Sequence, residues 1–168
     1  MRKINARVGN RGNALFAILL AGLFLMPLPS SLASTNADGA ASLKQILAEE
    51  LEEHPGGEVV GNEIHYDDGL VFVAVPVGTF SLSQCTSGRF CGWANAGYTG
   101  SFYWVSGSGT VSLSWTARSF SNNRSGTARL YNAAGTTSLC FPPRQNRTSI
   151  ASSHYNPSKV SLGSGTSC

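Results

Sequence analysis

The segment WANAGYTG, residues 93–100, limits the possible folds of this chain more than any other stretch. It places Trp93 five residues before Tyr98, and Gly100 two residues after it. Because glycine takes a positive φ at little cost, the chain can fold back on itself at Gly100. The pattern is consistent with a binding stripe, with a piece of an active site, or with the way in which a small fold closes a β-hairpin.

From Cys85 onward the composition is typical of an all-β domain. Gly, Ser, Thr and Asn are dense, helical periodicity is absent, and turn signals are frequent. Short β-forming runs recur at 102–105, 110–115 and 127–131. We therefore expect an all-β fold built from short strands.

A weak internal repeat supports two units of similar build. The segment YNAAGTTS, residues 131–138, aligns with residues 93–100. It keeps an aromatic residue at Tyr131 but has Thr136 and Ser138 where the second aromatic residue and the glycine would stand. We interpret the repeat as two duplicated four-strand motifs packed as a sandwich.

The N-terminal residues 1–33 have the pattern of a signal peptide. A basic start is followed by the apolar run ALFAILLAGLFLM at 14–26, which is too short to span a bilayer comfortably. Ser31 and Ala33 are small residues at the positions that signal peptidases require, so we expect cleavage after Ala33. The pattern predicts a secreted, extracellular protein that does not span the membrane after cleavage.

Residues 34–80 form a predicted acidic leader, with a helix at about 40–53 and a β-hairpin at about 58–76. The leader holds all nine acidic residues of the chain, and none follows it. The basic residues beyond the leader are Arg89, Arg118, Arg124, Arg129, Arg144, Arg147 and Lys159. Two interpretations are open: an acidic pro-segment that shields a basic domain at 81–168, or a soluble acidic helix without a charge-based role.

Four cysteines, Cys85, Cys91, Cys140 and Cys168, follow the leader. In an exported chain an even number indicates disulfides rather than a metal site, and no C-x-x-C pair occurs. Of the three possible pairings we favour Cys85–Cys91, which closes a tight loop, together with Cys140–Cys168, which fixes the C-terminus. These bonds would contribute about 2–2.5 and about 3–4 kcal/mol through loop entropy. Such stabilisation matters for a small domain whose core is marginal.

The hairpin pattern is similar to the folded-hairpin signature of βγ-crystallin Greek keys. The wider frame, from CTSGRFCGWANAGYTGSF through ARSFSNNRSGTARLYN to the last cysteine, resembles peptidase inhibitor family I36, typified by a streptomycete metalloproteinase inhibitor. The resemblance covers residues 81–168. It implies a βγ-crystallin-like Greek-key sandwich of two motifs, with a short N-terminal and a longer C-terminal disulfide. It also implies a secreted inhibitor of an extracellular peptidase, in particular a metallopeptidase.

A protein inhibitor needs a convex loop that is rigid before binding, because little entropy is then lost on association. The predicted inhibitory loop consists of Cys140, Phe141, Pro142, Pro143 and Arg144. Its prolines stiffen the chain, and Phe141 is a bulky apolar residue of the kind that thermolysin-like enzymes accept after the scissile bond. We expect Cys140–Phe141 to be the presented bond. Alternatively, Phe141 is a core residue at a strand end.

A second candidate for the inhibitory loop is the segment between Cys85 and Cys91, with Arg89 at its edge.

Catalysis has little support in the sequence. The histidines are His54, His65 and His154, and the β-domain contains no carboxylate to orient one of them. A Ser-His-Asp triad would have to use Asp67 or Asp68 from the leader. Neither G-x-S-x-G nor H-E-x-x-H occurs. We therefore expect a protein that is not an enzyme and uses no cofactor.

Crystallin-type domains often bind calcium, and the corresponding positions here are SWTARS at 114–119 and RQNRTS at 144–149. Of the ligand pattern only Ser119 and the pair at 148–149 remain, and Arg118 and Arg144 bring positive charge close by. Calcium requires several oxygen ligands, usually including carboxylates. We therefore expect no metal site, and a calcium-binding structural protein is the third functional hypothesis.

The second hypothesis is a non-catalytic module that binds carbohydrate or the cell envelope. In the run SFYWVS, Phe102 and Trp104 lie on one face of a strand, and Tyr103 and Val105 on the other. If one face stayed exposed near another tryptophan, it could stack on sugars. The basic charge would suit anionic cell-wall polymers and would give only nonspecific nucleic-acid binding. In a small sandwich, however, two core faces are the more common outcome.

Overall fold

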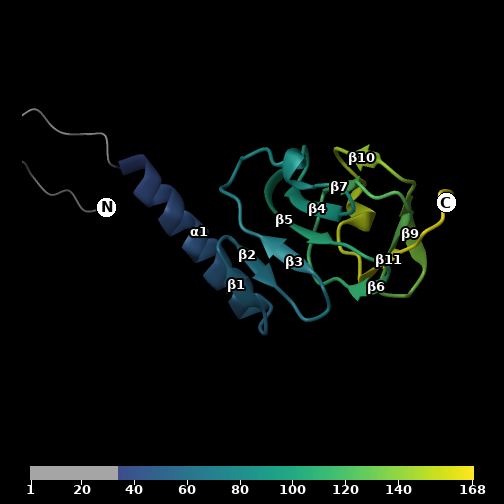
Figure 1. Cartoon of the computed structure of the whole chain (residues 1–168), viewed down its shortest axis with the longest axis horizontal. Coiled ribbons are helices and arrows are strands. Elements are labelled where there is room, and N and C mark those ends of the chain that lie inside the picture. Colours follow the sequence, from purple (N-terminus) through teal and green to yellow (C-terminus); the bar gives the residue numbers. More distant parts are fainter. Residues whose placement is uncertain (1–33) are drawn as a thin grey trace, which may run out of the picture. The chain divides into compact units, whose positions relative to one another are not determined.

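The computed structural model describes residues 34–168, which form one α-helix, two short 3-10 helices and eleven strands in two antiparallel sheets (Figure 1). The predicted all-β class is confirmed. The predicted signal peptide, residues 1–33, lies outside the described residues. Within the part that is described, no helix is both long enough and apolar enough to cross a membrane.

The larger sheet, sheet A, has seven strands in the order β1-β2-β3-β5-β4-β7-β10. Their bounds are β1 Glu58–Val60, β2 Glu63–His65, β3 Val71–Val73, β4 Phe90–Asn95, β5 Thr99–Val105, β7 Ser119–Asn122 and β10 Gln145–Arg147. The smaller sheet, sheet B, has the order β6-β11-β8-β9. Its bounds are β6 Gly109–Ser112, β8 Ala128–Tyr131, β9 Thr137–Phe141 and β11 Lys159–Leu162.

The two sheets exchange one strand each, and this exchange defines the fold. The first motif consists of β4 to β7 and the second of β8 to β11. In each motif the first, second and fourth strands lie in one sheet, whereas the third strand joins the other sheet. Thus β6 pairs with β11 in sheet B, and β10 pairs with β7 in sheet A. This topology is the two-motif βγ-crystallin-like Greek-key sandwich that the sequence predicted.

The repeated segments at 93–100 and 131–138 occupy equivalent places in the two motifs. The first covers the turn between β4 and β5, and the second covers the turn between β8 and β9. Both hairpins contain an irregularity in the strand register near the turn. The weak repeat therefore marks the same hairpin in each Greek key.

The β4–β5 hairpin is closed by the residues of its aromatic pattern. Gly100 has φ 76, and a Cβ at this position would lie 2.8 Å from Asn95 Nδ2. Trp93 is fully buried and meets Tyr98 edge to face, with 5.1 Å between the ring centroids. Its indole Nε1 donates a hydrogen bond to Ser81 Oγ at 2.8 Å, which satisfies the one polar atom of the ring.

The leader continues sheet A. Its helix α1 (Ser34–Glu53) ends immediately before His54, and β1, β2 and β3 form a short antiparallel meander. Strand β3 also pairs with β5, with Val71 opposite Trp104 and Val73 opposite Phe102. The sequence predicted the helix and the hairpin but not this pairing, which makes the leader part of the same sheet as β4 and β5.

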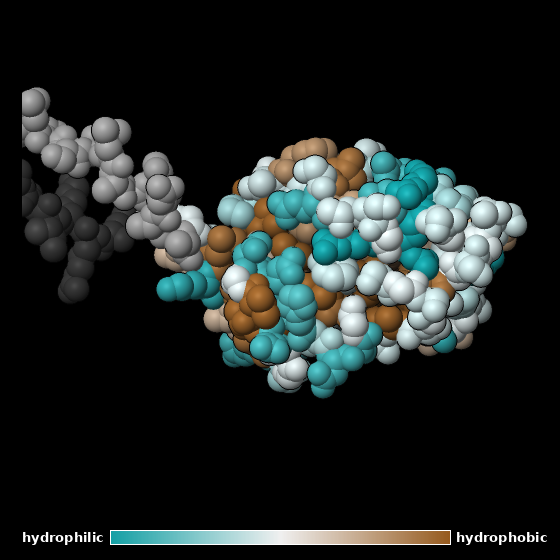
Figure 2. All heavy atoms as spheres, in the orientation of Figure 1, coloured by the Kyte–Doolittle hydropathy of each residue, from teal (hydrophilic) through white to brown (hydrophobic). Residues whose placement is uncertain are grey.

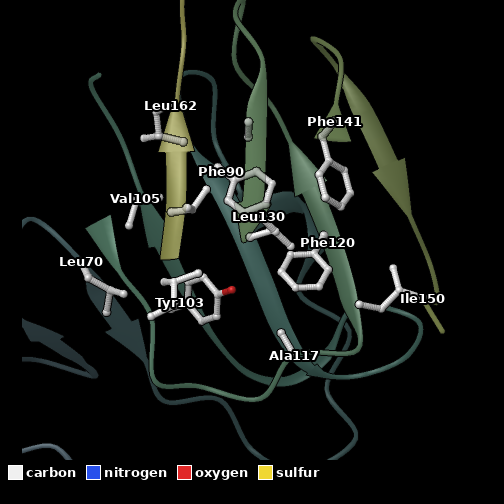
Figure 3. Close-up of a cluster of buried hydrophobic side chains, with 13 residues drawn as sticks. Leu70, Phe90, Tyr103, Val105, Ala117, Phe120, Leu130, Phe141, Ile150 and Leu162 are labelled. Carbon is white, nitrogen blue, oxygen red and sulfur yellow. The ribbon is translucent and has the colours of Figure 1, made fainter. Parts of the chain in front are cut away.

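The main core lies between the two sheets (Figure 3). Phe90, Phe120, Leu130 and Phe141 point toward one another from four different strands. Leu70 of the leader belongs to the same cluster and is fully buried. A separate cluster holds α1 against the meander through apolar side chains of the helix, which pack on Ile64, Phe72 and Ala74.

Candidate functional site

The disulfide between Cys85 and Cys91 closes a short loop just before β4. Residues 86–88 at its tip are exposed. Asn123, which follows β7, forms two hydrogen bonds with the loop. Its Nδ2 donates to Cys85 O at 2.7 Å, and its backbone carbonyl oxygen accepts a hydrogen bond from Gly88 N at 2.8 Å. The disulfide and Asn123 therefore both hold the loop in place.

The turn between β9 and β10 lies beside this loop. Arg144 in the turn has φ 60, in the left-handed region that few residues other than glycine adopt. Its guanidinium donates to Asn123 O at 3.0 Å and to Ser87 Oγ at 3.2 Å, and it also contacts Asn123 Oδ1. Hydrogen bonds of one arginine thus join the turn to the disulfide loop. We term residues 85–89, 122–124 and 142–145 the braced edge.

Asn122 fixes the start of the turn from inside the protein. It is fully buried, and its Nδ2 lies within hydrogen-bond distance of the carbonyl oxygens of Phe141 (3.1 Å), Pro142 (2.8 Å) and Gly126 (2.9 Å). The two loops that the sequence offered as separate candidates are therefore neighbours, supported by consecutive asparagines.

The bond Cys140–Phe141 is not presented, which corrects the expectation from the sequence. Phe141 is fully buried and packs against Phe90 and Phe120, with centroid distances of 5.4 and 5.6 Å (Figure 3). A peptidase could reach its side chain only if the end of β9 left the core. The alternative interpretation, a core residue at a strand end, is the correct one. The exposed part of the predicted loop is Arg144, with Pro142 and Pro143 half-buried.

The second predicted disulfide is also present. Cys140, in β9, is bonded to Cys168, which ties the C-terminus to sheet B. Residues 34–168 contain no free cysteine. Both favoured pairings are thus formed in the structure.

Several arginine side chains lie within the braced edge or next to it. The Arg89 guanidinium lies 3.7 Å from the ring centroid of Trp104, and that of Arg147 lies 4.8 Å from Phe141. Arg124 is buried and donates to two backbone carbonyls, and burial lowers the pKa of its guanidinium. The ion pairs within residues 34–168 are two histidine–glutamate pairs of the leader. The edge therefore carries positive charge without a carboxylate partner.

The tryptophans do not form a platform for sugar stacking. Trp93 is fully buried, Arg89 covers the ring of Trp104, and His54 stacks on Trp115 at 4.3 Å between centroids. Both faces of β5 are buried, because Phe102 and Tyr103 are each 2% exposed. No tryptophan in the described part of the chain is exposed, so a carbohydrate-binding surface of the expected kind is not supported.

One group of three potential metal ligands occurs among residues 34–168, and it lies in the leader: Glu50, Glu53 and His54. Glu50 Oε1 already accepts a hydrogen bond from Trp115 Nε1 and one from Tyr66 OH at 3.4 Å, and it lies 2.9 Å from His54 Nδ1. Burial raises the pKa of Glu50 despite these contacts. We interpret the cluster as the contact that attaches α1 to the sandwich.

Ser119, one of the few positions of the calcium-ligand pattern that remain in the sequence, has a structural role. Ser119 is fully buried; its Oγ donates to Asn95 O at 2.6 Å and accepts a hydrogen bond from Tyr98 N at 3.0 Å. The hydroxyl therefore stabilises the β4–β5 hairpin.

Two features of the site were missed by sequence reasoning. The roles of Asn122 and Asn123 were not foreseen, although two amides at the end of a β-forming run are a signal that could have indicated buried hydrogen bonds. Two cavities of about 530 and about 600 Å³ adjoin Trp115, and His54 and Glu53 line both. They depend on the packing of α1 against the sandwich, which the sequence did not predict.

Comparison with known proteins gives one family. Residues 78–141 match the model of peptidase inhibitor family I36, a range that includes the disulfide loop, β4 to β9 and both asparagines. No curated protein and no solved structure matches the chain.

Proposed function

We propose that this chain, a member of peptidase inhibitor family I36, is an extracellular protein that inhibits a metallopeptidase by placing its braced edge in the active-site cleft. The observation that carries the proposal is the link from Arg144 to Asn123 and Ser87, which joins the exposed turn to the disulfide loop. The family supplies the general activity. The target class and the binding surface are our inference.

Rigidity of the edge supports inhibition. An inhibitor gains affinity when its contact loop is ordered before binding, because immobilising a loop and its side chains costs free energy. Here the disulfide, the half-buried prolines and the asparagine hydrogen bonds order the edge in the free protein. A disulfide-braced loop of this kind fits the inhibitory role that the family implies.

The hydrogen bonds of Arg144 also favour a metallopeptidase over a trypsin-like serine peptidase. A trypsin-like enzyme binds the free guanidinium of an extended arginine in a pocket that contains a carboxylate. The guanidinium of Arg144 is turned back onto Asn123 and Ser87. It would have to give up these bonds to enter such a pocket.

The test is a titration of the purified protein against a thermolysin-like metallopeptidase, with trypsin as the comparison enzyme. We expect stoichiometric inhibition of the metallopeptidase and none of trypsin. Arg144→Ala should raise the inhibition constant about tenfold or more, because the loss of charged hydrogen bonds, each worth about 1.5–3 kcal/mol, frees the turn.

Lys159→Ala is the matched control for this titration. It removes a positive charge at the end of sheet B where Lys159 pairs with Tyr131, whereas Phe141 and the braced edge are at the Ala128 end. Equal effects of the two substitutions would show that charge alone matters. Absence of inhibition at micromolar protein would refute the metallopeptidase proposal for that enzyme class.

A further inference from the structure

The loop at residues 76–80 carries the most exposed large apolar side chain of the described chain. Val77 is 88% exposed and Phe80 is 60% exposed. The braced edge offers no comparable group, because its exposed residues are small or polar and Phe141 is buried. Figure 2 shows that apolar residues reach the surface mainly on the half of the molecule that carries α1 and β1 to β3. The two surfaces therefore differ in chemistry.

The loop is a defined turn. Thr79 N donates to Pro76 O at 3.1 Å, and Gly78 has φ 80. A glycine with positive φ at the third position and a hydrogen bond from the fourth residue to the first are the marks of a type II β-turn. Val77 occupies the second position, at the tip, and proline in the first position restricts the chain before it.

The end of the loop is fixed to the β4–β5 hairpin. Gly100 N donates to Thr79 O at 3.2 Å, and Ser81 N donates to Tyr98 O at 3.0 Å. Phe80 forms a bridge with Thr99, and its ring meets Tyr98 edge to face at 6.1 Å. The loop is thus attached to the β4–β5 hairpin by hydrogen bonds and an aromatic contact, and its apolar tip projects from this ordered support.

Two large apolar side chains exposed on the same ordered loop, rather than scattered singly over the surface, are a feature of interaction sites. We propose that Val77 and Phe80 form an apolar knob that fills a hydrophobic subsite of the target peptidase. The inference rests on the proposed function and adds a second contact to it. The braced edge supplies shape and charge, whereas the knob supplies apolar groups, and a few well-buried anchor residues carry most of the binding energy in interfaces.

The experiment compares Val77→Ser with Val60→Ser. Val60 is a matched control because it is 53% exposed on β1, the outer strand of sheet A. Neither change removes a buried side chain, so equal melting temperatures establish that both variants are folded. We expect Val77→Ser to raise the inhibition constant against a thermolysin-like metallopeptidase about tenfold, which is the loss of one buried valine, and Val60→Ser to leave it unchanged.

Phe80→Ser extends the comparison, with an expected increase of about thirtyfold or more because a larger apolar area is lost. If Val77→Ser and Phe80→Ser inhibit as well as Val60→Ser and the wild type, the knob is not a contact, and the inference is wrong while the inhibitor proposal stands. If the wild-type protein does not inhibit, the proposed function fails and the inference fails with it.

Discussion

Leu70 tests whether the leader belongs to the core of the β-sandwich. It lies immediately before β3, is fully buried, and packs in the main cluster with Tyr103 and Val105 of β5. Replacing it with alanine removes buried methyl groups and leaves a cavity that the two sheets cannot easily close. Such Leu→Ala changes in tightly packed cores cost about 2.7–5 kcal/mol. For a domain of ordinary stability, about 5–15 kcal/mol, this is a large fraction of the free energy of unfolding.

The measurement is urea denaturation with both disulfides intact. With a slope of about 1.5 kcal/mol/M, the expected loss moves the midpoint of unfolding down by about 2 M or more. Val60→Ala is the control in the same leader, because Val60 is half exposed and its truncation should cost less than about 0.5 kcal/mol.

Equal midpoints for Leu70→Ala and Val60→Ala would refute the reasoning. The leader would then be an appendage that rests on the sandwich, and the cooperatively folded domain would begin after it. A loss of the size given above means that a truncated protein without the leader lacks a core residue as well as a strand.

Two further predictions concern α1 and the C-terminus. Burial raises the pKa of Glu50 in the folded protein, so the folded state takes up the proton more readily than the unfolded chain. The stability from this group is present at acid pH and is lost as the pH rises above the ordinary value of 4.5. Glu50→Gln should therefore gain stability relative to wild type as the pH rises through this range, measured by thermal denaturation. A difference in melting temperature between Glu50→Gln and the wild type that stays constant with pH would contradict this prediction. Removing the disulfide that closes 28 residues, by Cys140→Ser with Cys168→Ser, should cost about 3.5 kcal/mol, against about 2 kcal/mol for the pair separated by 6 residues. Equal losses of melting temperature for the two double variants would show that loop entropy does not govern their stability.

Local patterns in the sequence predicted the parts of the fold that depend on local interactions. Trp93, Tyr98 and Gly100 lie within one hairpin, so the likeness of their spacing to the folded-hairpin signature was enough to predict how it closes. The cysteine pairings were favoured because one closes a short loop and the other fixes the chain end. The pairing of β3 with β5 was not predicted, because the choice of a strand's neighbour depends on contacts between segments distant in the sequence.

The site was predicted only in part, for a related reason. The segment at 140–144 was chosen because it contains a bridged cysteine, two prolines and a large apolar residue. These features do not distinguish a phenylalanine that faces a target from one that faces the core. The alternation along β9 places Phe141 inward, opposite Ala128, and this register was set by the partner strand. Val77 and Phe80 were not singled out in the sequence, because exposure cannot be read from residue type.

The strand exchange between the sheets has a consequence for how the newly made chain acquires its structure. Strand β6 is synthesised early, but its partner β11 comes from residues 159–162, near the end of the chain. The first motif therefore cannot complete its pairing while the second is still being made. Folding is delayed until β11 has emerged, and a fragment that contains one motif would expose unpaired strand edges. If the chain is exported, as residues 1–33 predict, this delay would be useful, because export machineries that thread a chain through a pore need it unfolded.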